Sequence, residues 1–490
     1  MNIFKRRPDY WLPAYAMGTL SRARARRTRS SHLTHIMFLV CDHYEPQHDV
    51  KTPTQPAQRV QTWLREYARF QARCVDAFGS SPLHTWFYPP HHGEEHLKAL
   101  SQMVFDGLGE VELHYHHDGD TSETLRRDLI QTIDLYRRWG LLLESGVQPQ
   151  TKFGFIHGDW ALGNSGGGHF CGVNDELTIL EELGCWGDFT MPSANHCQTR
   201  KINSVYYAEG NAQKPKSHDW GPDAEVNVTN QRGMWLLQGP LGINWGAPKY
   251  PRIENASLTS ENWGRPDRIQ KWLDSNVHVK GRPDWLFIKL HTHGAIERDF
   301  DALFGEKAFA MHKMLNEQFN DGKQFRLHYV TARQAFNIAK AAEDGKIGDP
   351  SQWLDYRIAK QPHSFYMLTA RHTLVSCTRN NICIEEIDCG AGDSASSVTL
   401  SLAFGAVQEI DGVFSSATLD MAEETLLLDG MRPHAILRLK SRKNAPLQLN
   451  ESNQILELIS HEGCDVRRVT ANADGRLAVR FVRAELSKAA

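Results

Sequence analysis

The sequence lacks several features that would assign it to a class of protein at once. Basic and acidic side chains nearly balance over its 490 residues, with a formal net charge of −3, so charge gives no reason to expect nucleic acid or an anionic membrane as the main partner. No stretch approaches the roughly 18 apolar residues of a membrane span. The nine cysteines show no paired CxxC spacing, and their odd number argues against a disulfide framework. We therefore expect a soluble protein of a reducing compartment.

The start of the chain also lacks the apolar core of a signal peptide. A basic run extends from Arg22 to Arg29, and Pro13 and Gly18 interrupt the residues before it. A signal peptide needs roughly 7 to 15 apolar residues at such a position. Residues 1–34 are therefore predicted to be a basic, flexible leader, and the protein is expected in the cytoplasm.

Residues 35–345 alternate short β-type apolar runs with segments of helical periodicity. This alternation is typical of a parallel sheet built from βα units. About eight such units favour an α/β fold of the (β/α) barrel type, complete or distorted, with seven to eight strands. The expected strands are residues 36–40, 84–88, 111–113, 153–156, 189–191, 234–237, 285–290 and 326–330.

Two connections, residues 193–232 and 239–264, are long and rich in Gly, Pro, Asn and Ser. Long loops on the catalytic face of a barrel usually shape a substrate groove, although such a loop can also be a surface excursion without ligand contact. Both alternatives stay open from the sequence.

The end of the chain changes in composition. Residues 346–362 are predicted to be a linker, because Lys, Gly, Asp, Pro and Ser replace the helical periodicity there. Short alternating runs such as residues 398–402 and 435–439 follow, and they predict a small β-sandwich domain over residues 363–490. Carbohydrate binding, packing or structural support is the expected role of this domain.

Ionisable side chains gather where four of the expected strands end. Burying such groups without partners is costly, so imidazoles and carboxylates at one sheet edge are most easily explained by a shared cation. In a barrel, the carboxyl ends of the strands form the face that carries the active site. The four strand ends carry, in chain order, Asp42, His43 and Glu45; Glu110, His114, His116, His117, Asp118 and Asp120; His157, Asp159 and Trp160; and His291 and His293.

The order of these motifs resembles that of the polysaccharide deacetylases, carbohydrate esterase family 4 and its relatives. In that family the first strand ends in a catalytic base followed by a metal ligand, and the resemblance places these roles on Asp42 and His43. The late strand of the family ends in a histidine that acts as general acid, which His291 matches after Leu290. The arginine that orients the family's base has no counterpart after the fourth strand.

The second motif of the family contains a Glu followed by two metal histidines four positions apart. Placing Glu110 on that Glu implies His114 as the first ligand and Asp118 as the second, so that a carboxylate stands in place of a histidine. His116 and His117 are rival ligands from the same segment. The remaining candidates for the metal or for its second layer of contacts are His157, Asp159 and His293.

The resemblance implies a metal-dependent hydrolase that removes acetyl or other acyl groups from a carbohydrate or polysaccharide precursor. The expected cofactor is a divalent metal, Zn²⁺ in the first place, with Mn²⁺, Co²⁺ or Ni²⁺ as alternatives. Asp42 would take the proton of the attacking water, and His291 would protonate the leaving group. Three tryptophans are predicted to offer ring faces to sugar, namely Trp160, Trp186 and Trp245.

Two other functions are compatible with the same residues. The first is a glycoside hydrolase that uses Asp42 or Glu45 together with Asp159 or Asp188, which requires a separation of about 5 to 5.5 Å or about 6.5 to 9.5 Å between the paired carboxyl groups. The second is a non-catalytic, deacetylase-like protein that binds carbohydrate or serves as a scaffold in polysaccharide assembly. A metal requirement would separate the deacetylase from both.

Overall fold

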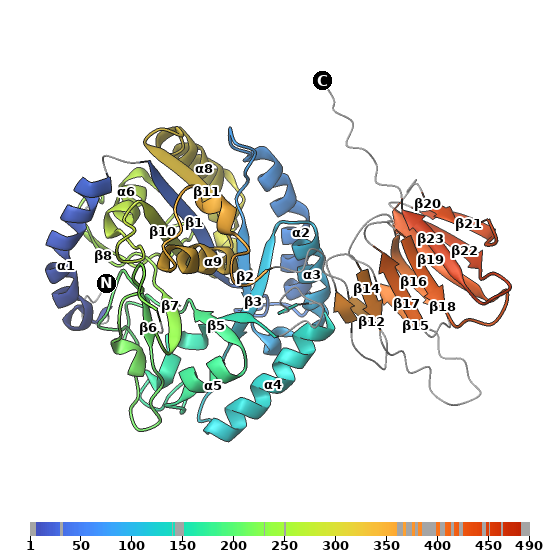
Figure 1. Ribbon diagram of the computed structural model, residues 1–490, viewed down its shortest axis with the longest axis horizontal. Coiled ribbons are helices and arrows are strands. Elements are labelled where there is room, and N and C mark those ends of the chain that lie inside the picture. The colour runs from blue at the N-terminus through green and yellow to red at the C-terminus, as the bar shows by residue number, and fades with distance from the viewer. Residues whose placement is uncertain are drawn as a thin grey trace. The chain divides into compact units, whose positions relative to one another are not determined.

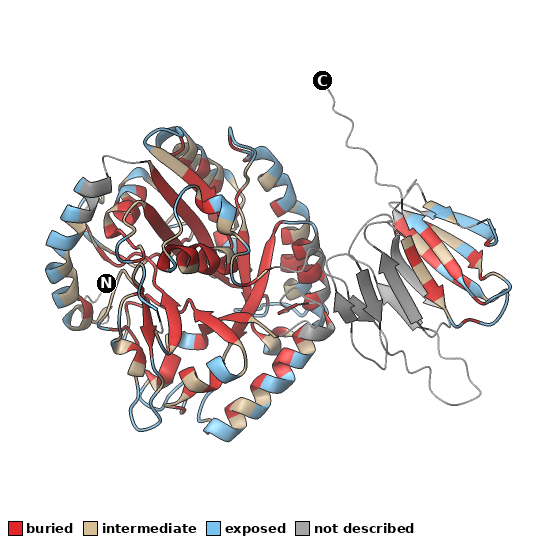
Figure 2. Cartoon of the chain, in the orientation of Figure 1, coloured by how far each residue is buried: buried red, intermediate tan, exposed pale blue. Residues whose placement is uncertain are grey.

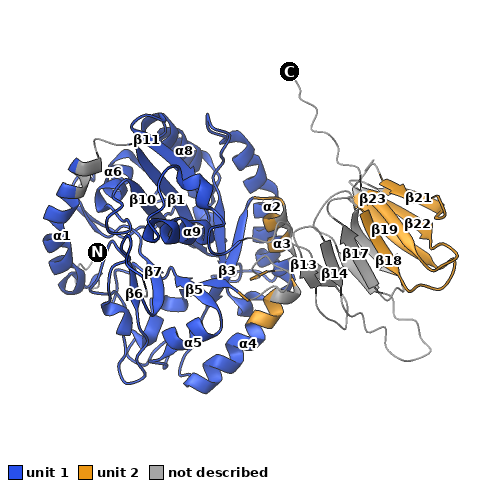
Figure 3. Cartoon of the chain, viewed as in Figure 1, with its two compact units in different colours: residues 1–99, 108–132, 152–359 blue, residues 100–107, 133–151, 360–490 orange. Residues whose placement is uncertain are grey.

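The computed structural model of the chain (Figure 1) has a large central sheet whose strands are mostly buried (Figure 2). The chain divides into two compact units (Figure 3). Unit 1 contains Met1–Ala99, Leu108–Thr132 and Lys152–Ala359, and unit 2 contains Leu100–Gly107, Ile133–Thr151 and Lys360–Ala490. The structure describes residues 6–29, 33–139, 141–142, 151–229, 231–248, 251–359, 366–368, 375–377, 381–384, 398–401, 407–412, 416–420, 425–442, 447–449, 451–461 and 464–481.

Unit 1 is built on a nine-stranded sheet in the order β10-β1-β2-β3-β4-β5-β7-β6, with β11 also paired to β1. Its ladders are parallel, except that β6 runs antiparallel to β7. An α/β fold around a large parallel sheet is therefore confirmed, whereas closure into a barrel stays a prediction. The strands are β1 (Thr34–His43), β2 (His84–Tyr88), β3 (Gly109–Tyr115), β4 (Phe153–His157), β5 (Cys185–Asp188), β6 (Val205–Ala208), β7 (Met234–Leu237), β10 (Trp285–Thr292) and β11 (Phe325–Tyr329).

Most of the predicted strands agree with these bounds, and one does not. The strands predicted at residues 84–88 and 234–237 have the observed limits. The strand predicted at residues 189–191 lies instead at β5, which ends at Asp188. The apolar residues after β5 pack inside the unit, where the N–H of Phe189 still donates to the carbonyl of Phe155 in β4. The carbonyls of Phe189 and Met191 accept hydrogen bonds from the buried Lys289 ammonium of β10.

β1 pairs with three strands. β10 pairs with residues 35–42 of β1, while β11 and β2 pair with residues 34–38 and 41–43. Because a strand has two edges, β11 and β2 share one edge of β1 and β10 occupies the other. The parallel arrangement brings the carboxyl ends of β10, β1, β3 and β4 to one edge of the sheet, where ligand sites of α/β proteins form.

The helices include those that the apolar periodicity predicts. In α2, apolar side chains that recur at helical spacing are buried, namely Val60, Trp63, Tyr67 and Phe70. Among the described helices, none combines the length and apolar character that crossing a membrane requires. The α-helices are α1 (Pro8–Arg29), α2 (Gln55–Arg73), α3 (Leu97–Phe105), α4 (Ser122–Arg138), α5 (Glu176–Glu182), α6 (Pro266–Ser275), α7 (Phe300–Leu303), α8 (Glu306–Phe319) and α9 (Ala332–Glu343), and the short 3-10 helices are η2 (Pro90–His92), η3 (Glu94–His96), η4 (Gly158–Trp160), η5 (Leu162–Asn164), η6 (Ser217–Asp219), η7 (Glu297–Asp299) and η8 (Pro350–Trp353).

Residues 8–29 of the predicted leader form helix α1. Trp11 is buried with Ala194 and Leu241 in a small apolar cluster, and its indole nitrogen donates a hydrogen bond to the carbonyl of Arg6. The Lys271 ammonium of α6 donates to the Tyr15 hydroxyl, 2.8 Å away. These anchors come from distant residues, so the composition of the segment did not reveal them.

Residues 346–359 of the predicted linker pack on unit 1. Ile358 is buried, and Trp353 lies against the main core of the unit. The Asn337 amide of α9 donates to the carbonyls of Leu354 and Ile358, at 2.7 and 2.8 Å. Backbone carbonyls of this segment therefore have hydrogen-bond partners in helix α9 of unit 1.

Unit 2 contains two six-stranded antiparallel sheets, in the orders β12-β15-β16-β19-β22-β21 and β13-β14-β17-β18-β23-β20. The β-rich character predicted for residues 363–490 agrees with this topology, and packing of the sheets as a sandwich stays a prediction. A separate two-stranded sheet in unit 1 pairs β8 (Gly242–Asn244) with β9 (Arg252–Glu254). The unit 2 strands are β12 (Tyr366–Leu368), β13 (Val375–Cys377), β14 (Asn381–Ile384), β15 (Val398–Ser401), β16 (Val407–Gly412), β17 (Ser416–Asp420), β18 (Thr425–Asp429), β19 (Ile436–Arg442), β20 (Leu447–Leu449), β21 (Ile455–His461), β22 (Cys464–Thr470) and β23 (Leu477–Phe481).

Candidate active site

Side chains from several strand ends meet at the carboxyl edge of the unit 1 sheet. His43 ends β1, His114 and His116 lie on β3 and just beyond it, and His293 follows β10. The ring centroid of His43 lies 4.7 Å from that of His114 and 5.0 Å from that of His293. We call the following group the rim cluster: His43, Glu45, His114, His116, Asp159 and His293.

Three atoms of the rim cluster converge. The Oε1 atom of Glu45 lies 2.9 Å from Nε2 of His116 and 3.7 Å from Nε2 of His114, and the two nitrogens are 3.0 Å apart. Ligand atoms about 2.0–2.1 Å from a zinc ion lie roughly 3.3 Å from one another at tetrahedral angles. The three observed spacings bracket that value, so these atoms fit a shared divalent cation.

The outer nitrogens of both imidazoles fix which way the lone pairs point. Nδ1 of His114 lies 2.9 Å from the carbonyl oxygen of Ile156, and Nδ1 of His116 lies 3.2 Å from Oδ2 of Asp159. Because a carbonyl or a carboxylate can only accept, both Nδ1 atoms carry the proton and donate it. The two Nε2 lone pairs then face each other and Glu45, which is unfavourable unless a proton or a cation lies between them.

The electrostatics of the rim cluster agree with this geometry. Burial alone would raise the pKa of the Glu45 carboxyl, but the imidazoles of His114 and His116 hold that pKa well below its usual range. Burial alone would lower the pKa of His116, but the carboxylates of Asp159 and Glu45 raise it to about 9. The carboxylates around His116 therefore favour a positive charge at the point where the three atoms converge.

Two buried histidines at this edge of the sheet, His43 and His291, are neutral. Burial, followed by the adjacent imidazole of His114, lowers the pKa of His43 well below its ordinary value, and burial next to Lys289 does the same for His291. Within the part of the chain that the structure describes, Nε2 of His43 and Nδ1 of His291 have no hydrogen-bond partner. Buried, neutral and unpartnered imidazole nitrogens are available to a ligand.

The turn after β4 brings a carboxylate and an indole to the rim cluster. A Cβ atom at Gly158 would lie 2.4 Å from Cγ of His116, so only glycine permits this approach. Asp159 and Trp160 follow with φ angles of 52° and 58°, a left-handed conformation that costs non-glycine residues energy. The Trp160 ring centroid lies 5.5 Å from that of His43 and 6.1 Å from that of His291. Strained backbone of this kind is characteristic of functional sites.

Asp42, the predicted catalytic base, is engaged elsewhere. Its Oδ2 atom accepts a hydrogen bond from Nε2 of His84 at 2.8 Å, and its Oδ1 atom accepts one from the backbone N–H of Gly294 at 2.6 Å. The carboxyl group is completely buried. Asp42 lies one residue before His43 on β1, so its side chain points to the opposite face of the strand.

Asp118, the predicted second metal ligand, is exposed and does not join the rim cluster. Its Oδ1 atom accepts a hydrogen bond from the backbone N–H of Phe170 at 2.7 Å. The reason is that β3 continues to Tyr115. On an extended strand alternate residues share a face, so His114 and His116 meet each other, whereas a spacing of four residues leads into the loop.

The three predicted sugar-binding tryptophans have different environments. Trp160 borders the rim cluster and is half-buried. Trp186 is buried in the core, with its ring centroid 5.0 Å from that of Phe336. Trp245 is 69% exposed, next to the β8–β9 sheet. Of the three, only Trp160 lies at the candidate site.

The long connection over residues 239–264 supports the site through its backbone. The N–H of His291 donates to the carbonyl of Ala256, and the carbonyl of His291 accepts from the N–H of Leu258. These two hydrogen bonds hold the end of β10. That the loop also shapes a substrate groove stays a prediction.

Sequence reasoning assigned no metal-binding role to Glu45, Cys171 or Glu176. Glu45 stands two positions after His43, and that alternation of His and Glu at a strand end was the available signal. Cys171 and Glu176 lie far from any strand end in the sequence. Together with His117 and His157 they form a second group of potential metal donors, which is described below.

Comparison with known proteins yields one remote likeness. No protein-family model and no curated protein sequence matches the chain. A solved structure from Parabacteroides distasonis, described as a candidate glycoside hydrolase/deacetylase, aligns with 85% of this chain and 82% of its own, at 11% identity and a TM-score of 0.34. Because that likeness is so distant, the function is inferred below from the residues of the site.

Proposed function

We propose that the protein is a metal-dependent hydrolase that removes acetyl or other acyl groups from a carbohydrate, with the rim cluster as its active site. The convergence of Glu45, His114 and His116 on one point carries this proposal. The point is accessible, because the side chains of His116 and Asp159 are 28% and 46% exposed. A divalent cation held there would lower the pKa of a bound water and polarise an acyl carbonyl.

Four residues of the rim cluster have distinct parts in this scheme. Glu45, His114 and His116 hold the cation, and Asp159 orients His116 through the hydrogen bond to its Nδ1 atom. Asp159 contacts the side of the His116 ring that is remote from the cation position, so it acts through His116 and not directly on the attacking water. Glu45 and His116 thereby replace His43 and Asp118 as proposed ligands.

His291, near the end of β10, is the proposed proton donor to the leaving group. A neutral imidazole can donate an N–H to a developing oxygen or nitrogen anion, and burial keeps the imidazole of His291 neutral. The half-buried ring of Trp160 lies beside both this histidine and His43. An indole in such a position offers an apolar face on which a sugar ring can pack.

A glycoside hydrolase fits the same residues less well. Glu45 and Asp159 contact opposite nitrogens of the His116 ring, at 2.9 and 3.2 Å, so an imidazole fills the space between the two carboxylates. Asp188 is buried, with both of its oxygens accepting hydrogen bonds from Thr190. Paired carboxylates that act on a glycosidic bond need the substrate between them.

The proposal is tested by acetate release from acetylated oligosaccharides, combined with metal analysis of the purified protein. We expect a chelator to abolish acetate release and added Zn²⁺ to restore it. His114→Ala should abolish acetate release and lower the metal content, because it removes a buried ligand. His196→Ala serves as the matched control, since His196 is an exposed histidine outside both donor groups.

Chelator-resistant acetate release would contradict the proposal, and so would a His114→Ala variant with full metal content and full activity. Binding of oligosaccharide without any turnover by the metal-loaded protein would favour the non-catalytic alternative. Cleavage of the glycosidic bond in the same assay would favour the glycoside hydrolase.

A further inference from the structure

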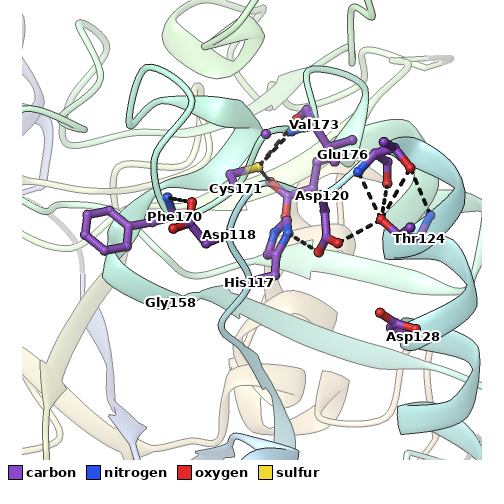
Figure 4. A network of polar contacts seen from close by, with 12 residues as sticks. His117, Asp118, Asp120, Thr124, Asp128, Gly158, Phe170, Cys171, Val173 and Glu176 are labelled. Atoms are coloured by element: carbon purple, nitrogen blue, oxygen red, sulfur yellow. Dashed lines mark hydrogen bonds and ion pairs between the residues drawn. The ribbon is translucent and has the colours of Figure 1, made fainter.

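A second group of potential metal donors lies beside the rim cluster, in the loops that follow β3 and β4. We call His117, His157, Cys171 and Glu176 the loop cluster. His117 follows β3, His157 ends β4, Cys171 lies in the loop after η5, and Glu176 is the first residue of α5. The side chains of His117, His157 and Glu176 are no more than 3% exposed, and Cys171 is buried. Figure 4 shows His117, Cys171 and Glu176 directed toward one another.

The donor atoms of the loop cluster have the spacing of ligands around one ion. Nε2 of His117 lies 2.9 Å from Nε2 of His157 and 3.1 Å from Oε1 of Glu176, and the third separation, from His157 to Glu176, is 3.2 Å. Tetrahedral zinc ligands lie roughly 3.3 Å apart when each is about 2.0–2.1 Å from the ion. The thiol of Cys171 belongs to the same group, whose four potential ligand atoms all lie within 4.8 Å of one another, and it supplies a fourth donor.

Three of the four donor residues make a hydrogen bond through the atom that faces away from the group. This leaves Nε2 of each histidine and Oε1 of Glu176 available to an ion. Nδ1 of His117 lies 3.0 Å from Oδ2 of Asp120, and Nδ1 of His157 lies 2.5 Å from the carbonyl oxygen of Gly158. Both acceptors require a proton on Nδ1, so the Nε2 lone pairs face each other. The other oxygen of Glu176 accepts the N–H of Gly163 at 2.6 Å. Orienting contacts of this kind surround metal ligands in proteins.

From this geometry we infer that the loop cluster is a structural zinc site with the ligands His117, His157, Cys171 and Glu176. Four protein ligands complete a tetrahedral shell and leave no open position, as structural zinc sites do. Cys171 binds as the thiolate, and its proton passes to water. The rim cluster differs, because its convergent donors number three in the described structure and its outer side is exposed.

The position of the loop cluster assigns it a role in the architecture of the edge. His117 adjoins His116, and His157 precedes Asp159 by two residues, so an ion in the loop cluster would fix two residues of the rim cluster. It would also tie the loop that carries Cys171 to the end of β4. The inference does not depend on the proposed reaction.

Cobalt substitution tests the inference without reference to activity. After removal of bound metal and loading with Co²⁺, a thiolate ligand produces a sulfur-to-cobalt charge-transfer absorption in the near ultraviolet, and the rim cluster contains no sulfur that could produce it. We expect this absorption in the unmodified protein, its loss in Cys171→Ser, and its retention in Cys74→Ser. Cys74 is also a buried, free cysteine and is therefore a matched control.

Zinc content gives a second, independent measurement. The unmodified protein should hold about two equivalents of zinc per chain, and Glu176→Gln, which keeps an acceptor for Gly163, should lose about one. His114→Ala should also lose about one equivalent, but it should keep the cobalt charge-transfer absorption. If the absorption is missing from the unmodified protein, or survives Cys171→Ser, the inference is wrong. A zinc content unchanged by Glu176→Gln would likewise overturn it, and a Glu176→Gln variant that fails to fold leaves the cobalt result to decide.

Discussion

Asparagine substitutions at Asp42 and Asp159 should have opposite consequences, the first for stability and the second for activity. Asp42→Asn can still accept the N–H of Gly294, but it replaces a charge-assisted hydrogen bond to His84 with a neutral contact in a completely buried position. Buried hydrogen bonds to charged groups contribute about 1.5–3 kcal/mol. We expect the free energy of unfolding of unit 1 to fall by about that amount, and acetate release to fall by less than about tenfold.

Asp159→Asn should leave the free energy of unfolding within about 0.5 kcal/mol, because the side chain is 46% exposed. The activity, in contrast, should fall steeply. Removing the carboxylate that orients a metal histidine costs about 10- to 100-fold. A loss in that range, equivalent to about 1.4 to 2.7 kcal/mol in the activation free energy, is therefore expected.

Denaturant unfolding followed by tryptophan fluorescence measures the first effect. The ring centroids of Trp63 and Trp86 lie 4.9 and 5.5 Å from that of His84, so the fluorescence reports on the environment of Asp42. Acetate release, with kcat and KM determined separately, measures the second effect. A stable but inactive Asp42→Asn variant, paired with an active Asp159→Asn variant, would refute the reasoning and restore Asp42 as the base.

Two further predictions concern buried groups away from the candidate site. Burial lowers the pKa of His312 from 6.5 to about 3. Between these pH values the unfolded chain binds more protons than the folded chain, so the free energy of unfolding falls on acidification. The fall is about 2 kcal/mol from pH 6.5 to about pH 5. His312→Gln, which can still accept from Tyr329, should remove that part of the pH dependence of unfolding, and an unchanged slope would contradict this account. Glu110 accepts hydrogen bonds from the Arg333 guanidinium at 2.9 Å and from the Thr331 hydroxyl at 2.8 Å. Glu110→Ala should therefore lower the free energy of unfolding by about 3–5 kcal/mol, because it leaves a buried charge without its partner. A loss below about 1 kcal/mol would contradict this account.

The strand ends were predictable because they depend on local pattern. Apolar runs of five to eight residues followed by polar residues mark buried parallel strands. The predicted strand at residues 36–40 lies within β1, and the prediction at residues 285–290 lies within β10. The structure places the histidines and carboxylates that follow such runs along one edge of the sheet.

Which donors meet was harder to predict from the sequence, because extending a strand by one residue changes which side chains share a face. The sequence motif suggested His114 with Asp118, which assumes that the chain leaves the strand at His114. β3 extends to Tyr115 instead, so that His116 shares a face with His114 and Asp118 turns outward. A shift of one position in a strand reverses the face of every following side chain.

The sequence by itself determined that this chain forms parallel βα units and which strand ends carry ionisable side chains, since both depend on the order of residues along the chain. Only the tertiary structure decided which of those side chains meet. Glu45 meets His114 of β3 and His116 just after it, and Cys171 meets Glu176, because separate loops return to the same edge of the sheet. It also decided that the N-terminal segment forms a helix anchored by Trp11. Contacts between distant segments depend on the packing of the whole unit, which local periodicity does not encode.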